Sequence, residues 1–212
     1  MLRVLSFDLD GTLIKKDFDD IFWNQQIPKI FAERRKITFE EAQKFVIEEY
    51  DKVGPSDARW YIPEYWFELF DLGASLQDVL HKVNYAAGVY DDVGILQDFA
   101  RNYQIIISTN NPRAILEHKL SILKHVRQYI SYTFSSVSDF NNIVKNREFY
   151  AQVCSRLRIK PEHMLHVGDD PKYDLEEPSS IGVNAVLMDR QQTTSKQVIH
   201  TLEDLKQLLT NC

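Results

Sequence analysis

Cysteine is scarce in this chain, with two residues among 212. Cys154 lies in a helical pattern and Cys212 is the last residue, so we expect two unpaired thiols and neither a disulfide framework nor a zinc site. No apolar run approaches the roughly eighteen residues that span a bilayer, and the sequence does not open on a signal-peptide pattern. We therefore expect a soluble, cytoplasmic protein with no membrane partner.

An excess of basic residues is also absent. The chain has 25 lysines and arginines against 31 aspartates and glutamates, a formal net charge of −6, and no basic face stands out. The electrostatic footprint of a nucleic-acid partner is therefore missing. The chain does have 44% hydrophobic and 12% aromatic residues, which is typical of a folded protein. Its length allows one domain with a large insertion or two small domains.

Residues 16–87 differ in composition from the rest of the chain. They carry nine lysines and arginines against fourteen aspartates and glutamates, and they hold all three tryptophans and fourteen of the 25 aromatics. Such a change in composition indicates an inserted module.

Within this module the apolar residues recur with helical spacing. Thr38 and Glu41 have the spacing of a capping box. We expect Asp17 or Asp20 to cap the first helix, and Pro28, which lacks an amide hydrogen, to kink or split it. The pattern predicts about four helices and no strand.

Outside the module, helical and strand patterns alternate. Buried strands are predicted at residues 2–7, 105–107, 129–136, 164–167 and 185–188. Strands separated by helices form a parallel sheet with right-handed crossovers. We therefore predict an α/β fold with a Rossmann-like parallel-sheet core over residues 1–15 and 88–212 and a helical domain over residues 16–87.

Polar and acidic side chains gather where the predicted strands end. They are Asp8 and Asp10, Thr109 and Asn110, Lys145, and Asp169, Asp170 and Asp174. The carboxyl ends of parallel strands lie at one edge of the sheet, where open α/β sheets bind their ligands. We therefore expect these side chains to converge, although each cluster by itself also suits an ordinary turn.

These residue types suit the binding of a metal ion and of an anionic group. Asp8 and Asp169 offer the hard oxygen ligands that Mg²⁺ prefers. An aspartate nucleophile divides hydrolysis into two displacements. Thr109 and the Lys145 ammonium suit phosphoryl oxygens. Asn110 has two interpretations, a phosphate contact or the opening residue of a loop.

In this order the clusters resemble the signature of the haloacid dehalogenase superfamily. The sequence D-x-D-G-T at residues 8–12 is similar to its first motif, Thr109 to its second and Lys145 to its third. G-D-x4-D at residues 168–174 is similar to its fourth motif. Asn146 departs from the pattern, because proline often follows the third-motif lysine.

The resemblance covers the predicted core, and it places the helical module where one large class of the family carries a cap domain. It implies that Asp8 is a nucleophile forming an aspartyl-phosphate and that Asp10 is the general acid and base. It also implies that Mg²⁺ is held by Asp8, Asp169 and the backbone carbonyl of Asp10. Thr109 and Lys145 would then bind the phosphoryl group.

We expect different roles for the three acids of the fourth motif. The pattern favours Asp169 over its neighbour Asp170 as the direct metal ligand. Asp174 is expected to orient Lys145 or a metal-bound water.

His166 lies in an apolar strand, and we expect a satisfied core histidine there instead of a ligand. Arg113 is expected to be a solvated residue in the first turn of a helix.

Asp10 and the acidic fourth motif favour hydrolysis of a small phosphorylated metabolite over metal-independent dehalogenation, which keeps no acid at the second position. A phosphomutase remains an alternative, as does a non-catalytic domain that uses the module's aromatic residues as a partner surface. The acidity of the module suits a sugar, alcohol or short acid phosphate. We hypothesise that Lys15, Lys16 or Arg59 contacts the leaving group. The sequence decides nothing between a monomer and a homodimer.

Overall fold

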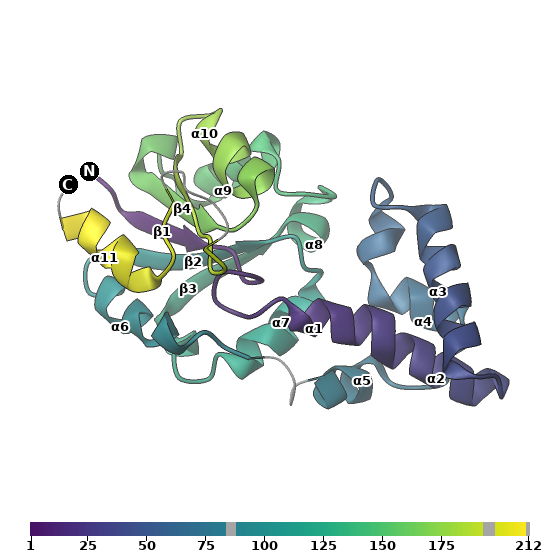
Figure 1. The fold of residues 1–212 in the computed structure, drawn as a ribbon. Helices are drawn as coiled ribbons and strands as arrows, with labels where there is room; N and C mark the ends of the chain where they lie inside the picture. Colours follow the sequence, from purple (N-terminus) through teal and green to yellow (C-terminus); the bar gives the residue numbers. More distant parts are fainter. Residues whose placement is uncertain (84–87, 193–197, 211–212) are drawn as a thin grey trace. The chain divides into compact units, whose positions relative to one another are not determined.

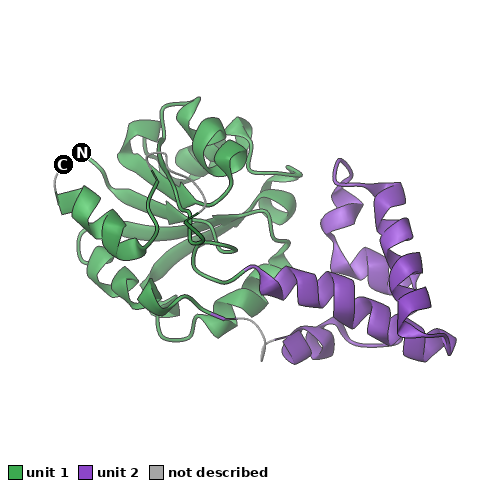
Figure 2. Cartoon of the chain, in the orientation of Figure 1, with its two compact units in different colours: residues 1–15, 89–212 green, residues 16–88 purple. Residues whose placement is uncertain are grey.

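The computed structural model describes residues 1–83, 88–192 and 198–210. The chain divides into two compact units, one of Met1–Lys15 with Val89–Cys212 and the other of Lys16–Gly88 (Figure 2). No described helix is long and apolar enough to cross a membrane.

The first unit is built on a five-stranded parallel sheet with strand order β3-β2-β1-β4-β5 (Figure 1). The strands are β1 (Val4–Phe7), β2 (Gln104–Thr109), β3 (Ile130–Ser135), β4 (Met164–Gly168) and β5 (Asn184–Leu187). The predicted parallel α/β core is therefore confirmed, with each strand within a few residues of its predicted position.

Helices cover both faces of this sheet (Figure 1). They are η3 (Asp91–Ile95), α6 (Leu96–Phe99), α7 (Arg113–Ile122), η4 (Arg127–Tyr129), α8 (Ser136–Phe140), α9 (Arg147–Leu157), η5 (Pro161–His163), η6 (Pro171–Glu176), α10 (Glu177–Ser179) and α11 (Leu202–Thr210). Apolar residues of α6, α7 and α11 pack with Leu5, Phe7 and Ile107 on one face. Apolar residues of α9 pack with Val4 and Ile106 on the other. Alternate strand residues thus fill two separate apolar layers.

Strand order creates a switch point beside β1. The chain runs from β1 to β2 and β3 on one side and then returns to place β4 on the other side of β1. In open parallel sheets, ligands bind at the carboxyl ends of the strands where the order reverses. Residues that follow β1 and β4 are therefore in the position that this fold class uses for chemistry.

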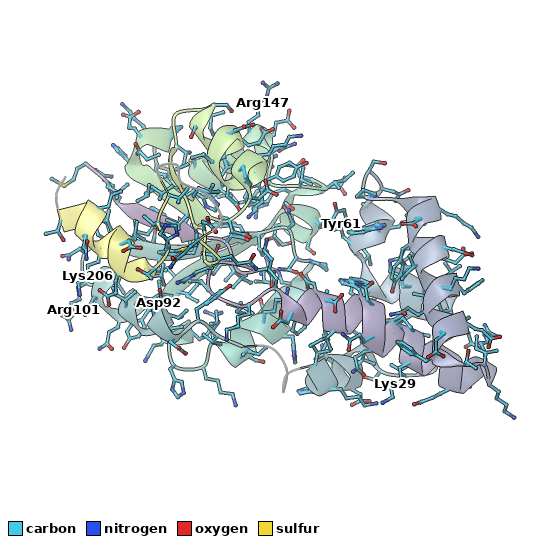
Figure 3. All side chains as sticks on the ribbon, viewed as in Figure 1. Lys29, Tyr61, Asp92, Arg101, Arg147 and Lys206 are labelled. Carbon is cyan, nitrogen blue, oxygen red and sulfur yellow. The ribbon has the colours of Figure 1, made fainter. Side chains whose placement is uncertain are left out.

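The C-terminal helix is joined to the rest of the core unit through Asp98. Lys206 of α11 lies 2.9 Å and Arg101 lies 3.5 Å from carboxylate oxygens of Asp98. Both basic residues lie on the same side of the unit (Figure 3). The hydrogen bond from Lys206 lowers the pKa of Asp98, because a charged donor favours the ionised carboxyl group.

The second unit has helices and no strand among its described residues. Its elements are α1 (Asp17–Asp19), η1 (Asp20–Gln26), α2 (Ile27–Arg35), α3 (Phe39–Val53), η2 (Ala58–Tyr61), α4 (Pro63–Leu69) and α5 (Leu76–Val83). The capping box of Thr38 and Glu41 is present at the start of α3.

Pro28 does not split the first helical stretch of this unit, because the backbone stays helical from Asp17 to Arg35 and only its hydrogen bonding changes, from α to π over η1. Pro28, which has no amide hydrogen to donate, is the second residue of α2, which directly follows the π-helix η1 inside this helical run. The predicted cap was wrong. Neither Asp17 nor Asp20 caps a helix; Lys16 precedes α1, and Asp20 instead accepts from the side chains of Asn24 and Gln25.

The aromatic residues of the helical unit mostly pack against one another. Trp66 is fully buried, with its ring centroid 4.6 Å from that of Tyr50 and 5.5 Å from that of Phe70. Trp23 meets Tyr50 edge to face. This packing favours the structural role of these aromatic residues over a role as a partner surface.

Two further expectations have clear outcomes. Cys154 is a buried free thiol, as predicted, whereas Cys212 lies outside the described residues. Arg113 is not simply solvated, because it pairs with Asp139 and Glu117 and donates to the Thr133 hydroxyl. The predicted role was wrong because local sequence did not show that β3 and α8 bring Thr133 and Asp139 to the start of α7.

Candidate active site

Asp8 directly follows β1 at the switch point. Its backbone N–H donates to the Val167 carbonyl of β4 (2.9 Å), which fixes the point where its side chain leaves the sheet. The residue is 7% exposed. Gly11 has a φ of 74°, and the turn it permits lets its N–H reach the Ile14 carbonyl (2.7 Å). Asp8 and Asp10 therefore lie on one short, fixed loop.

Lys145 joins two buried carboxylates. Its Nζ lies 2.7 Å from Asp8 Oδ1 and 2.5 Å from Asp174 Oδ1. Asn146, the departure from the family pattern, caps α9 by accepting from the Phe149 N–H (3.0 Å). The asparagine thus begins the helix directly after Lys145, and the lysine reaches the acids from this loop.

Asp174 is held from several sides and is 1% exposed. Its Oδ1 accepts from His166 Nε2 (2.9 Å), and its Oδ2 accepts from the Asp170 N–H (3.0 Å). The Tyr150 hydroxyl also lies 3.4 Å from Oδ1. These bonds fix the carboxyl group beside Lys145, which supports the expected orienting role of Asp174.

His166 is a satisfied core histidine, as its apolar strand predicts. Its Nδ1 lies 2.9 Å from Ser6 Oγ, which in turn lies 2.8 Å from Ser108 Oγ. Burial lowers the pKa of His166 and outweighs the opposing effect of Asp174. The neutral ring therefore links Asp174 to a row of polar side chains across β2, β1 and β4.

Three carboxylates could hold a metal ion. Asp8, Asp169 and Asp174 each offer one oxygen, and these oxygens all lie within 4.8 Å of one another. Such a set of hard oxygen donors fits Mg²⁺. Asp170 has a different place, because its Oδ1 accepts from the N–H groups of Lys172 and Tyr173 at the start of η6.

The charges in this cluster are strongly perturbed. Burial, together with the neighbouring carboxylates Asp174 and Asp169, raises the pKa of Asp8 well above its usual range, and Lys145 opposes the change. Burial opposes the charge of Lys145, but Asp174 and Asp8 outweigh it and raise the pKa of the ammonium. Burial also opposes ionisation of Asp174, yet Lys145 and His166 lower its pKa. A bound cation would favour the ionised form of all three acids.

Asp10 is held by two residues that the sequence reasoning did not include. Lys119 Nζ lies 2.7 Å from Asp10 Oδ1, and Asn111 Nδ2 donates to Asp10 Oδ2 (2.6 Å). Lys119 also donates to Asn111 Oδ1 (3.1 Å). Both oxygens of the Asp10 carboxylate therefore receive a donor.

Thr109 belongs to the same network. Its Oγ1 accepts from Asn111 Nδ2 (2.9 Å) and from the Asn111 backbone N–H (3.2 Å). A hydroxyl has two acceptor lone pairs and one proton. Because Asn111 occupies the acceptor side, the hydroxyl proton of Thr109 is left for another acceptor.

Asn110 supports the loop that carries Lys145. Its Oδ1 accepts from the Lys145 N–H (2.8 Å) and the Ser136 hydroxyl (3.1 Å). These contacts give Asn110 a structural task, and its direct contact with phosphate stays a prediction.

One sequence signal could have identified Lys119. In α7 the buried residues Ile115, Leu116 and Leu120 recur with helical spacing, and Lys119 falls on their face. Lysine is almost never fully buried unless it is paired. A lysine on an apolar helix face therefore indicates an acidic partner, although it does not say which one.

The three candidate leaving-group contacts are all exposed. Arg59 lies on η2 and donates from Nε to Asp57 Oδ1 (3.0 Å). The hydrogen bonds from Arg59 lower the pKa of Asp57 to about 2. Lys15 ends the first segment of the core unit, whereas Lys16 and Arg59 belong to the helical unit.

The sequence of this chain is similar to a known protein family and to individual members of it. The sequence profile of the haloacid dehalogenase-like hydrolases matches residues 2–182. The GMP/IMP nucleotidase YrfG of Escherichia coli strain K12 is 32% identical over 187 residues, which cover 85% of this chain and 79% of that protein. The same nucleotidase of Shigella flexneri has the same identity and coverage.

Solved structures agree on the fold. A HAD phosphatase from Thermococcus onnurineus superposes with a TM-score of 0.81 at 24% identity, covering 99% of this chain and 98% of that one. A 2-haloacid dehalogenase from Pseudomonas syringae gives a TM-score of 0.71 at 17% identity, covering 100% and 99%. With the profile match and the identity to YrfG, these likenesses show that this chain belongs to the haloacid dehalogenase-like hydrolases, as the order of its motifs predicted.

Proposed function

We propose that this hydrolase is a Mg²⁺-dependent phosphatase that hydrolyses a small phosphomonoester through an aspartyl-phosphate on Asp8. The main support is the buried cluster at the β1–β4 switch point, where Lys145 Nζ lies 2.7 Å from Asp8 Oδ1 and 2.5 Å from Asp174 Oδ1. An ammonium beside a nucleophilic carboxylate suits a reaction that brings a phosphate dianion to that carboxylate.

Asp8 and Asp169 would hold Mg²⁺, with Asp174 close enough to orient its ligands. The backbone carbonyl of Asp10 is proposed as a further ligand. An ion bound there would neutralise part of the phosphate charge beside Asp8.

In the first step, a carboxylate oxygen of Asp8 attacks phosphorus and the bond from phosphorus to the ester oxygen breaks. Asp10 gives its proton to that oxygen, so the alcohol leaves neutral. The Lys145 ammonium and the Thr109 hydroxyl bind the other phosphoryl oxygens as charge shifts toward the leaving group.

In the second step, water attacks phosphorus and Asp10 takes its proton. The bond from phosphorus to the Asp8 oxygen breaks, which releases inorganic phosphate and restores the carboxylate. Asp10 thus ends the cycle protonated, ready for the next ester.

Asp10 is the residue that favours a phosphatase over a dehalogenase. The fold itself does not decide, because both a phosphatase and a 2-haloacid dehalogenase superpose over nearly the whole chain. A phosphomutase uses the same two steps but returns the phosphoryl group to a bound intermediate. The GMP/IMP nucleotidase relative favours net hydrolysis.

That relative also directs the choice of substrate. We propose nucleoside monophosphates, beginning with GMP and IMP, as the first esters to test, alongside the small sugar and alcohol phosphates that the acidity of the helical unit suggests. Lys15, Lys16 and Arg59 remain our candidates for contacts to the leaving group. Alanine variants of all three with unchanged kinetics across this panel would reject that assignment.

The test is phosphate release from p-nitrophenyl phosphate and from this panel, with Mg²⁺ and with EDTA. Activity should require Mg²⁺ and should fall at least about a thousandfold in Asp8→Asn, which removes the nucleophile. Mass spectrometry of the acid-quenched enzyme should detect a phosphorylated Asp8 peptide. A protein that turns over no phosphate ester would instead support the non-catalytic alternative.

A further inference from the structure

We propose that Lys119 and Asn111 are positioning residues that hold the Asp10 carboxyl group in the orientation for proton transfer. This inference rests on the proposed function, in which Asp10 is the general acid and base. Lys119 Nζ lies 2.7 Å from Asp10 Oδ1, and Asn111 Nδ2 lies 2.6 Å from Asp10 Oδ2. The contacts join the loop after β1 to the segment that follows β2.

Burial makes the lysine a fixed support. The Lys119 side chain is 0% exposed, whereas that of Asp10 is 17% exposed. An ammonium withdrawn from water requires a charged or polar partner, and Asp10 and Asn111 are both within hydrogen-bond distance. The long side chain also loses its rotamer freedom on the apolar face of α7, so it presents its charge at one point.

The two donors define the plane of the carboxyl group without using all its capacity. Each carboxylate oxygen has two lone pairs. One donor on each oxygen therefore leaves a lone pair on each for the proton that Asp10 gives to the leaving alcohol and later takes from water. Proton transfer needs such alignment, because its rate falls steeply when the hydrogen bond is long or bent.

Asn111 also connects Asp10 with the phosphate clamp. Its Nδ2 donates to Thr109 Oγ1 (2.9 Å) as well as to Asp10. Asn111 thus supports both Asp10, the proposed proton donor, and Thr109, whose hydroxyl is proposed to bind the phosphoryl group. Loss of Asn111 is expected to raise KM as well as to impair proton transfer, whereas loss of Lys119 acts on Asp10 first.

The test compares two leaving groups in Lys119→Met and Asn111→Ala. The weakly basic p-nitrophenolate leaves without a proton, whereas an alkoxide, such as that of the best alkyl phosphate from the panel, must be protonated as it leaves. The parameter kcat/KM reports the steps up to release of the alcohol, so it isolates the first proton transfer from the attack of water.

In Lys119→Met, kcat/KM for the alkyl ester should fall about a hundredfold, and that for p-nitrophenyl phosphate should fall less than about tenfold. The kcat for p-nitrophenyl phosphate should also fall, with a burst of p-nitrophenolate, because water attack on the aspartyl-phosphate still needs Asp10 as base. Asn111→Ala should show the same selectivity, and it carries the test if Lys119→Met does not fold by circular dichroism.

Leu120→Ala is the matched structural control, since Leu120 is a buried neighbour on the same helix. It should destabilise the core without changing the ratio of the two kcat/KM values. Equal losses on both esters in Lys119→Met and Asn111→Ala would overturn the inference and leave the proposed function intact. A wild-type protein that hydrolyses neither ester would overturn both.

Discussion

Gly168 leaves the space that the side chain of Asp174 fills. A Cβ at position 168 would lie 2.7 Å from Asp174 Cβ and still closer to the carboxyl carbon, which is nearer than real Cβ contacts come. Asp174 in turn bonds Lys145 and His166. The glycine of the fourth motif therefore matters because it lets the acid pack against the end of β4, beside the lysine that reaches Asp8.

Gly168→Ala should consequently affect both stability and activity. The added methyl group must displace Asp174, and overpacking of this kind costs about 1–3 kcal/mol of unfolding free energy. Because Asp174 contacts Lys145, we also expect kcat/KM for p-nitrophenyl phosphate to fall at least about tenfold. Urea unfolding and phosphate release measure the two effects. Gly94→Ala is the control, since a Cβ there meets no atom within 4 Å, and a similar loss in that variant would contradict the explanation.

Metal binding should distinguish Asp169 from the adjacent Asp170. Mg²⁺ that binds only the folded state stabilises it by about 2.7 kcal/mol at a concentration roughly one hundred times its dissociation constant. We expect Mg²⁺ to raise the melting temperature of the wild type relative to EDTA. Asp169→Asn should abolish that rise, because it removes an oxygen of the three-carboxylate cluster.

Asp170→Asn should melt at a different temperature but keep the rise with Mg²⁺, since Asp170 bonds the start of η6 and is not in the cluster. The reverse pattern, with the rise lost only in Asp170→Asn, would show that our proposal assigns the metal to the wrong acid. Differential scanning fluorimetry with and without Mg²⁺ measures both variants.

Asn146 should contribute to stability as a helix cap. Its Oδ1 accepts from the Phe149 N–H at the start of α9. Asn146→Ala leaves that donor without its cap and should cost about 1 kcal/mol of unfolding free energy. Asn146→Asp keeps an acceptor and should retain most of the stability. Chemical denaturation of both variants checks this, and equal losses in the two would mean that the cap bond is not the cause.

Cys154 should react slowly in the native protein. Burial raises the pKa of its thiol from the ordinary 9.0 to about 11. The folded protein therefore keeps the thiol proton to a higher pH than the unfolded chain does. The free energy of unfolding is unaffected below pH 9.0 and decreases as the pH rises from there through about 11. In a Cys212→Ser background at about pH 8, we expect a disulfide reagent to label Cys154 far more slowly than in urea. Rapid native labelling would contradict this burial.

Much of the fold was accessible from the sequence. Short apolar runs separated by helical patterns predicted five parallel strands, and all five are present. Their positions could be predicted because a strand buried on both faces must be apolar at almost every residue. A helix boundary followed where a local signal existed, as at Thr38. The predicted cap of the first helix was wrong, because Asp20 accepts hydrogen bonds from Asn24 and Gln25, about one turn further along the helix.

Less of the candidate site than of the fold could be predicted from the sequence. Acids placed just after β1 and β4 converge because neighbouring parallel strands end at the same edge, and this rule needs no coordinates. The choice between adjacent residues was different. Asn110 supports the Lys145 loop, whereas Asn111 contacts Asp10, and no local pattern distinguishes these two asparagines.

Residue type and spacing along the chain were enough to predict the parallel core, the four polar clusters at its edge and the family. Two contacts could be known only from the folded chain: buried Lys119 bonds Asp10, 109 residues away, and Asp174 fills the space beside Gly168. Spacing fixes which strand end a residue occupies. The direction of its side chain, and therefore its partner, depends on packing between elements that are distant in sequence.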